Sequence, residues 1–368
     1  MVYMKNKAII VTFILVLITL TLSGCLDLFT SDDGSTTYQS HPTKISYTIS
    51  YGYKINCTGS GEYNIKYNCD LPEVLEGQIL HIFYWLTDDE SEEKTLATYN
   101  TVRSWNITNN TNKEYDLGIT AGVESESYIV SDLNGANALT IQEINDQHPA
   151  LVAQYCQAQS NETTVFIDPD NPNIIAIASE ILSNAGTNNA FLVAKELFIW
   201  LKQQTTYQTH GENNDAQPAE FTLQCKTGDC DDLSFLYMSL CRTIDIPARF
   251  IRGFLVEENS AVPHAWVEVF VGGNIGDNGW IPIECAGTAD KVETEVHQNF
   301  GVESTEHLRL FKDDGSNESL NISLVPLTYE TYGLNREVDP QPYAEITDYA
   351  VLRSNELVID KNGNRYYN

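Results

Sequence analysis

The segment from Asp229 to Cys285 constrains the fold most, because it orders one helix and three strands with short connections. After Cys230, apolar residues recur at helical spacing: Leu233, Leu236, Tyr237, Leu240, Cys241 and Ile244. Three strand-like runs follow at 249–256, 264–271 and 279–285, and a Gly- and Asn-rich loop joins the last two. That loop predicts an antiparallel hairpin. The segment therefore predicts an α+β core, with the helix packed on an antiparallel sheet.

Cys230 begins the predicted helix. Asp229 is a suitable N-cap, and Asp232 stands three residues further on, as a capping box requires. The positive end of a helix dipole favours a thiolate, whereas the carboxylates of Asp231 and Asp232 oppose it. A cationic partner would decide between the two effects. Cys241 falls on the buried side of the same helix, where a free cysteine usually serves packing.

The predicted hairpin brings a histidine and a carboxylate to one face of the sheet. With the turn centred at Asn274, His264 and Glu284 lie opposite each other. A carboxylate in that position can accept a hydrogen bond from one imidazole nitrogen and aim the other. Trp266 and Trp280 share this face and would help exclude water. Cys230, His264 and Glu284 therefore form a candidate thiol triad.

The same stretches resemble a known family. The motifs are "TGDCDDLSFLYMSLCRTIDIPARF", "HAWVEVFV" and "GWIPIECAG", preceded by "ELFIWLKQQTTY". With these motifs, residues 165–290 resemble the transglutaminase-like superfamily of papain-like thiol enzymes. The resemblance implies that Cys230 is the nucleophile and His264 the base. Glu284 stands where the family usually has Asp, and Asp245 stands where the family usually has Gly at the helix end.

The oxyanion donor has two candidates. One is the backbone N–H of Cys230 at the helix start. The other is the side chain of Gln224, six residues earlier, which has the spacing of the oxyanion glutamine in papain-like proteases. Attack on the thioester by water would make the protein a protease or amidase, and attack by an amine would make it a transglutaminase. The triad is common to both, and no EF-hand loop or other cofactor motif is found.

Two other hypotheses give Cys230 a different role. In the first, Cys230 is a zinc ligand together with Cys225, His264 and Cys285. In the second, Cys230 forms a disulfide with Cys225 or Cys285, and the chain is a non-catalytic surface lipoprotein with a binding cleft.

The N-terminus predicts export. Lys5 and Lys7 precede the apolar run 8–22, which is shorter than a spanning helix needs. The following Leu-Ser-Gly-Cys resembles the lipobox of prokaryotic lipoproteins. The resemblance implies a signal peptide at 1–24, lipid on Cys25 and an extracytoplasmic protein held at the membrane. An uncleaved N-terminal anchor is the alternative. Residues 25–42, rich in Ser, Thr, Asp and Gly, predict a flexible lipid-anchored spacer.

The rest of the chain divides by pattern. Alternating apolar residues at 45–51 and 63–67 flank a Gly-rich turn, which predicts a hairpin within a β-sandwich-like domain at 43–135. A disulfide between Cys57 and Cys69 is left open. Helices are expected at 173–184 and 189–204, with a long loop at 205–227. Residues 291–368 form a C-terminal extension, with strands expected at 308–312 and 320–325.

The net charge of the chain limits which kinds of partner it can bind. The net charge of −30 argues against nucleic acid, because phosphate contacts need clustered Lys and Arg. A solvated acidic surface is the expected consequence. The family resemblance and the expected location imply a polypeptide substrate, and the N-terminal segment implies the membrane as the other partner.

Overall fold

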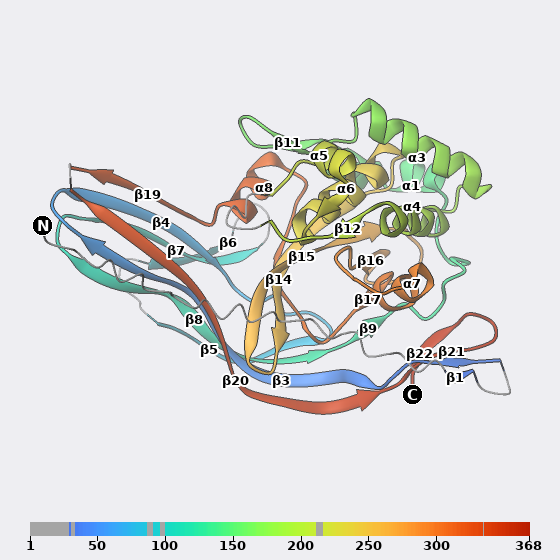
Figure 1. Cartoon of the computed structure of the whole chain (residues 1–368), viewed down its shortest axis with the longest axis horizontal. Coiled ribbons are helices and arrows are strands. Elements are labelled where there is room, and N and C mark those ends of the chain that lie inside the picture. The colour runs from blue at the N-terminus through green and yellow to red at the C-terminus, as the bar shows by residue number, and fades with distance from the viewer. Residues whose placement is uncertain (1–28, 31–33, 87–90, 96–99, 211–215, 334) are drawn as a thin grey trace, which may run out of the picture.

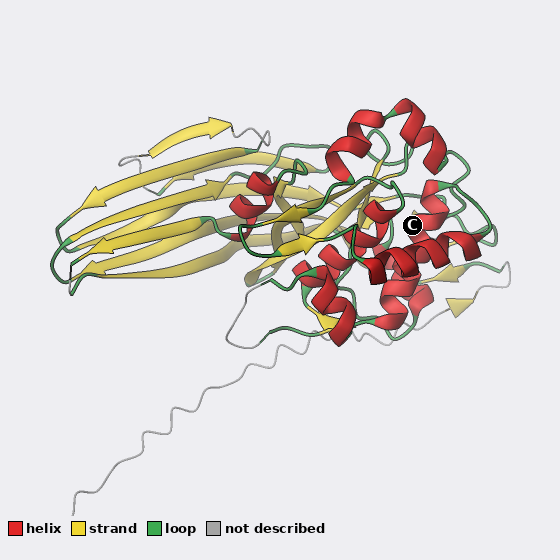
Figure 2. Cartoon of the chain, turned by 90° about the horizontal axis from the view of Figure 1, so that it is seen from above, coloured by secondary structure: helices red, strands yellow, loops and turns green. Residues whose placement is uncertain are grey.

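The computed structural model describes residues 29–368, apart from 31–33, 87–90, 96–99, 211–215 and 334. Its two parts are a long β-sandwich and a helical core built on another antiparallel sheet (Figure 1). Seen from above, the helices lie together at one end of the molecule, and the long strands of the sandwich extend to the opposite end (Figure 2). The predicted signal peptide, 1–24, and Cys25 lie outside the described residues. Within the described part of the chain, no helix has the length and apolar character to cross a membrane.

The sandwich consists of two four-stranded antiparallel sheets. One has the order β20-β3-β8-β5 (Glu337–Asn355, His41–Thr58, Lys113–Glu126 and Gln78–Trp85). The other has the order β19-β4-β7-β6 (Leu327–Tyr332, Glu62–Asp70, Thr101–Asn109 and Ser91–Thr95). Every second residue of β3 and β4 is buried between the sheets, including Ile45, Tyr47, Ile49, Tyr63, Ile65 and Tyr67. The alternating pattern in the sequence therefore marks two inner faces.

The predicted hairpin of β3 with β4 is wrong. β3 pairs with β8 and β20, and β4 pairs with β7 and β19. The turn between them carries the chain from one sheet to the other, with Gly59 at φ +88° and Gly61 at φ +119°. A Cβ atom on Gly59 would come within 1.7 Å of the Asn335 carbonyl oxygen, so this crossing needs glycine. Alternation shows which side chains are buried but not which strand is the neighbour.

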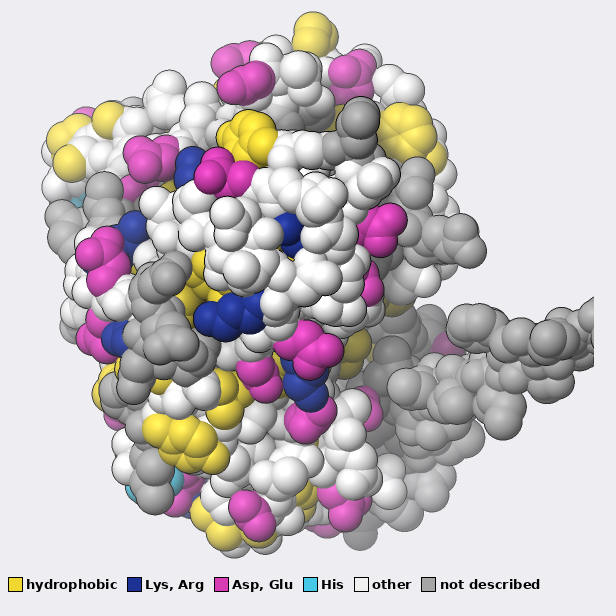
Figure 3. All heavy atoms as spheres, turned by 90° about the vertical axis from the view of Figure 1, so that its left-hand side faces the viewer, with side chains coloured by type: hydrophobic (Ala, Val, Ile, Leu, Met, Phe, Trp, Pro, Cys, Tyr) yellow, Lys and Arg dark blue, Asp and Glu magenta, His cyan; other side chains and the backbone are white. Residues whose placement is uncertain are grey.

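The surface of the sandwich end agrees with the acidic composition. Figure 3 looks at this end, and acidic side chains are scattered over it with basic ones between them. All seven described cysteines are free, including Cys57 and Cys69, which are buried in the core of the sandwich. The disulfide left open between these two is therefore not formed in this structure.

The core is built around helix α6 (Cys230–Thr243). It packs on β15 (Ser260–Phe270) and β14 (Ala248–Glu257), the central strands of a sheet completed by β16 (Trp280–Ile283) and β18 (His307–Lys312). Three helices surround α6, namely α3 (Pro172–Ala185), α4 (Ala190–Gln204) and α5 (Ala219–Cys225). The α+β fold expected from the sequence, a nucleophile helix on an antiparallel sheet next to an all-β part, is confirmed.

Smaller elements connect these parts. The remaining helices are α1 (Ile141–Gln147), α2 (Pro149–Tyr155), α7 (Val292–Asn299) and α8 (Asn317–Leu324). The short strands are β1 (Phe29–Thr30), β2 (Thr36–Thr37), β9 (Tyr128–Ile129), β10 (Gln159–Ser160), β11 (Val165–Ile167), β12 (Thr206–Tyr207), β13 (Thr227–Gly228), β17 (Val302–Glu303), β21 (Leu357–Ile359) and β22 (Arg365–Tyr367). The stretch 205–227, expected as a loop, therefore contains β12 and α5.

The residues from 291 onward contribute to both parts. β18 joins the core sheet, whereas β19 and β20 each form an edge of a sandwich sheet. The strand expected at 308–312 is present as β18, but the one expected at 320–325 is wrong, because helix α8 occupies that region. The Ser316 side chain caps α8 by accepting from the Ser319 N–H, and Leu320 and Ser323 are buried at helical spacing.

Candidate active site

The start of α6 is fixed by a capping box. The Asp232 carboxylate accepts a hydrogen bond from the Asp229 N–H at 2.9 Å, as the spacing of these residues predicts. Cys230 is the first helical residue and is half-buried, while Cys241 is fully buried in the core. At the other end of the helix, Asp245 adopts φ +61°, the left-handed conformation for which the family usually has Gly.

His264 and Glu284 meet, although not in the register expected. β15 and β16 pair Val267 with Ile283 and Phe270 with Trp280, so the hairpin is centred at residue 275 rather than 274. β16 ends before Glu284, and His264 pairs with Gly253 on β14. Because the shift moves the partner by two residues, both side chains stay on one face. The His264 Nε2 lies 2.7 Å from the Glu284 Oε2.

Glu284 is a point of convergence for three donors. Its Oε2 also lies 2.9 Å from the Nε2 of His307, and its Oε1 accepts from the Ala286 N–H at 2.5 Å. Although burial acts to raise it, the two histidines hold the pKa of Glu284 well below its usual range. Glu284 is therefore an anion that orients two imidazoles. The sequence analysis did not identify His307, whose only signal was a histidine at the start of a predicted strand.

The thiol of Cys230 lies beside the strand that carries His264. The backbone N–H of Ala265 points to the sulfur, and the Asp231 Oδ1 lies 3.9 Å from it. Burial, followed by the charges of Asp231 and Asp229, raises the pKa of the thiol well above its usual value. Burial and the nearby carboxylates therefore act against the helix dipole and favour the protonated thiol.

Thiolate formation therefore needs a base, and His264 has the appropriate orientation. Its Nε2 donates to Glu284, so in the neutral imidazole Nδ1 is left as the proton acceptor. The structure describes both Cys230 and His264 and forms no hydrogen bond between them. The carboxylate would stabilise the imidazolium once the thiol proton is transferred.

The two tryptophans on this face have different neighbours. The ring of Trp266 stacks on His264 at 6.0 Å between centroids and meets the ring of His307 edge-on at 4.8 Å. Trp280 lies against Arg249, whose guanidinium carbon is 4.0 Å from the ring centroid. Trp266 therefore shields the imidazoles, whereas Trp280 belongs to a cavity further along the sheet.

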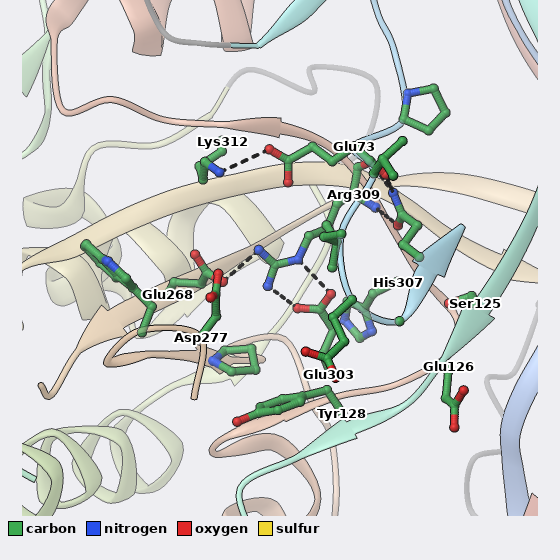
Figure 4. Close-up of a pocket in the computed structure, with 18 of the residues that line it drawn as sticks. Glu73, Ser125, Glu126, Tyr128, Glu268, Asp277, Glu303, His307, Arg309 and Lys312 are labelled. Atoms are coloured by element: carbon green, nitrogen blue, oxygen red, sulfur yellow. Dashed lines mark hydrogen bonds and ion pairs between the residues drawn. The ribbon is translucent and has the colours of Figure 1, made fainter. Parts of the chain in front are cut away.

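That cavity, of about 1190 Å³, lies between the sandwich and the core sheet. Figure 4 shows Arg309 between Glu268 and Glu303, with His307 next to this cluster. Although burial acts to raise it, Arg249 and Arg309 lower the pKa of Glu268 to about 2. The arginines and glutamates here form ion pairs with one another, and His307, which lines the cavity, connects it to Glu284.

The predicted oxyanion donors are placed differently. Gln224 is exposed on α5, and its amide donates to the Glu220 carboxylate at 3.2 Å, one turn earlier. The Cys230 N–H is at the helix start, as expected. Tyr207 is the last residue of the "ELFIWLKQQTTY" motif, and it lies close to Cys230. Burial and the neighbouring Cys230 raise the pKa of Tyr207 to about 12, so its hydroxyl remains a donor.

The alternative roles for Cys230 find no support among the described residues. Cys225 is exposed and its thiol faces the Thr227 carbonyl at 3.1 Å, while Cys285 is fully buried. Neither forms a disulfide with Cys230. The groups of potential metal ligands in the described ranges are His264, Glu284 and His307, and His210, Asp229 and Asp232; neither includes a cysteine.

Comparisons with known proteins agree with this core. Residues 175–285 match the sequence profile of the Transglutaminase-like superfamily, a match that contains Cys230, His264 and Glu284. No curated protein matches the chain.

Two solved structures are similar over larger parts of the chain. One, from Cytophaga hutchinsonii, is described as a "Putative Cysteine Protease"; it has 15% identity and a TM-score of 0.55, covering 91% of this chain and 100% of that one. The other is the periplasmic domain of TgpA from Pseudomonas aeruginosa, with 10% identity and a TM-score of 0.32, covering 67% of this chain and 92% of that one. The first likeness extends the shared fold beyond the matched core to nearly the whole chain.

Proposed function

We propose that this chain is a thiol enzyme that cleaves amide bonds of polypeptides. The acyl group is held as a thioester on Cys230 and then transferred to water or to an amine. One observation carries the proposal. A free cysteine at a helix start lies against the strand that carries His264, and the His264 imidazole is held by the buried anion of Glu284.

In the first half of the reaction, the Cys230 thiol gives its proton to the Nδ1 of His264 as the sulfur attacks the substrate carbonyl. Glu284 stabilises the imidazolium that forms. The Cys230 N–H and the Tyr207 hydroxyl are candidate donors to the oxyanion. The C–N bond then breaks, His264 returns the proton to the leaving amine, and the acyl group stays on sulfur.

The second half requires an acceptor for the acyl group. Water gives a carboxylic acid and makes the enzyme a protease or amidase, whereas an amine gives a new amide. The likeness in fold to the Cytophaga hutchinsonii protein, which is described as a "Putative Cysteine Protease", favours hydrolysis of a polypeptide. We place the reaction at the extracytoplasmic face of the membrane, with lipid on Cys25, on the basis of the N-terminal sequence alone.

Replacement of the nucleophile tests the proposal. Cys230→Ala is expected to lower the rate of acyl transfer by about a thousandfold or more, because no other side chain can form the thioester. Cys225→Ala is the matched control, since it removes an exposed thiol nearby. Full activity of a folded Cys230→Ala protein would disprove the mechanism.

The same assay separates the two acceptors. The protein is incubated with a glutamine-containing polypeptide and a labelled primary amine, and the products are analysed by mass spectrometry. Cleaved or deamidated polypeptide identifies a hydrolase, and amine-tagged polypeptide identifies a transglutaminase.

A further inference from the structure

A second imidazole contacts the carboxylate of the candidate triad. His307 begins β18, outside the residues 175–285 that match the superfamily. Its Nε2 lies 2.9 Å from the same Glu284 oxygen that the His264 Nε2 approaches at 2.7 Å. His307 is 8% exposed, so water competes little for this hydrogen bond.

We infer that His307 is a positioning residue, which holds the Glu284 carboxylate in the orientation that His264 needs. The inference rests on one part of the proposed function, namely that His264 accepts the proton of the Cys230 thiol. It adds a fourth side chain to the candidate triad and makes β18 part of the active site.

The need for such a residue follows from the glutamate. Glu284 stands where the family usually has Asp, and its side chain has one more rotatable bond, whose freedom is lost when the carboxylate is fixed. Here both oxygens are restrained: Oε2 by His307 and His264, and Oε1 by the Ala286 N–H. Without His307, the Glu284 Oε2 would be held by His264 alone, and His264 must also accept the thiol proton.

His307 is held in turn by its own neighbours. Its Nδ1 lies 2.9 Å from the Ser304 hydroxyl, and the Trp266 ring packs edge-on against it. The Ser304 oxygen accepts from the Glu306 N–H, which leaves its proton free to point at Nδ1. His307 Nε2 then carries a proton and donates to the carboxylate. Both of its nitrogens are thus satisfied in the tautomer that Glu284 requires.

A metal ion is the other explanation for this cluster, since two histidines and a glutamate are a common zinc ligand set. The distances favour hydrogen bonds. Tetrahedral zinc would hold its nitrogen and oxygen ligands about 3.3 Å apart, and the two N–O distances here are 2.7 Å and 2.9 Å. The short separations fit shared protons.

Two substitutions test the role of His307. His307→Leu removes the donor and is expected to lower kcat about tenfold or more, with little change in KM, because the residue does not touch substrate. His307→Gln keeps an N–H donor at the end of the side chain and is expected to recover most of the loss. His81→Leu, a histidine in the sandwich that is 54% exposed, is the matched control.

A second readout does not depend on a substrate. The rate of Cys230 alkylation by iodoacetamide reports on removal of the thiol proton, and it should fall in His307→Leu and recover in His307→Gln. If the wild-type protein shows no acyl transfer but alkylation follows this pattern, the proposed function fails and the inference stands.

Three outcomes would overturn the inference. A folded His307→Leu protein with unchanged kcat and alkylation rate would show that Glu284 needs no second histidine. Equal loss in both variants, in proportion to a lowered Tm, would show a purely structural role. One tightly bound zinc ion per chain, lost in His307→Leu, would show that the cluster is a metal site.

Discussion

At the scale of single residues, the unusual feature of the site is the carboxyl group of Asp231. Burial, with the charges of Asp229 and Asp232, raises the pKa of Asp231 to about 7. Its oxygen lies 3.9 Å from the Cys230 sulfur, so the ionised form opposes the thiolate. Asp231 therefore makes the Cys230 thiol less acidic, and His264 must be basic enough to take the thiol proton despite this effect.

Asp231→Asn is expected to lower the pKa of the Cys230 thiol, because the amide carries no charge. The rate of iodoacetamide alkylation, measured against pH, should rise at lower pH than in the wild-type protein. The substitution Asp314→Asn, at an aspartate away from Cys230, should leave the profile unchanged. A profile shifted to higher pH would contradict the account.

Stability provides a second measurement on the same variant. The Asp231 carboxyl has a pKa of 3.8 in the reference state and about 7 in the folded chain, so the unfolded chain releases this proton first. As the pH rises from about 3.8 to about 7, the free energy of unfolding therefore falls, because the unfolded chain has released the Asp231 proton and the folded chain still holds it. Asp231→Asn should abolish that loss, which thermal unfolding at several pH values can detect.

At the scale of elements, helix α6 is the part of the site that the sequence predicts best. Its cap and its apolar period are local features, so Asp229, Cys230 and the buried face could be identified without knowing the fold. The hairpin register could not, because the loop between β15 and β16 contains several residues with positive φ, including Gly272, Gly273 and Asn278. Such a loop does not place its centre by residue count alone.

The start of α6 also fixes the preceding loop. Asp232 is fully buried, and its carboxylate accepts the N–H of Gln217 at 2.6 Å as well as that of Asp229 at 2.9 Å. It also contacts the His210 ring. This side chain therefore joins the helix start to residues that come before it in the chain.

Asp232→Ala is expected to lower the free energy of unfolding by about 2–3 kcal/mol, because buried N–H groups lose a charged acceptor. Asp170→Ala, at an exposed aspartate, is the control and should change it by less than about 0.5 kcal/mol. Urea unfolding measures both. Equal stability of the two variants would show that the capping box contributes little.

At the scale of the whole molecule, the sequence indicates a β part and a catalytic core but not how the C-terminal residues join them. β20 is mostly exposed along its 19 residues and forms the edge of its sheet, so it lacks the alternation that marks a half-buried strand. Sequence pattern therefore finds β3 and β4 but misses the strands that flank them. His307 is missed for a different reason: its strand, β18, is predicted, but the sequence does not show that β18 pairs with β14 and brings His307 to Glu284.

A chain that ends after residue 290 is expected to lose both its cooperative fold and its activity. It would lack β18 with His307, and β3 and β4 would each lose a neighbouring strand. Near-ultraviolet circular dichroism and the acyl-transfer assay test this. An active, cooperatively unfolding product would show that the core is independent of the C-terminal region.

The central claim is that Cys230 carries the acyl group, and the most direct test is to map the covalent intermediate. The protein is mixed with an activated acyl substrate, quenched in acid, digested and sequenced by mass spectrometry. We expect one acyl group on the peptide that contains Cys230 and none in the Cys230→Ala protein. An acyl group on another residue, or turnover of the substrate with Cys230 unmodified throughout, would contradict the account.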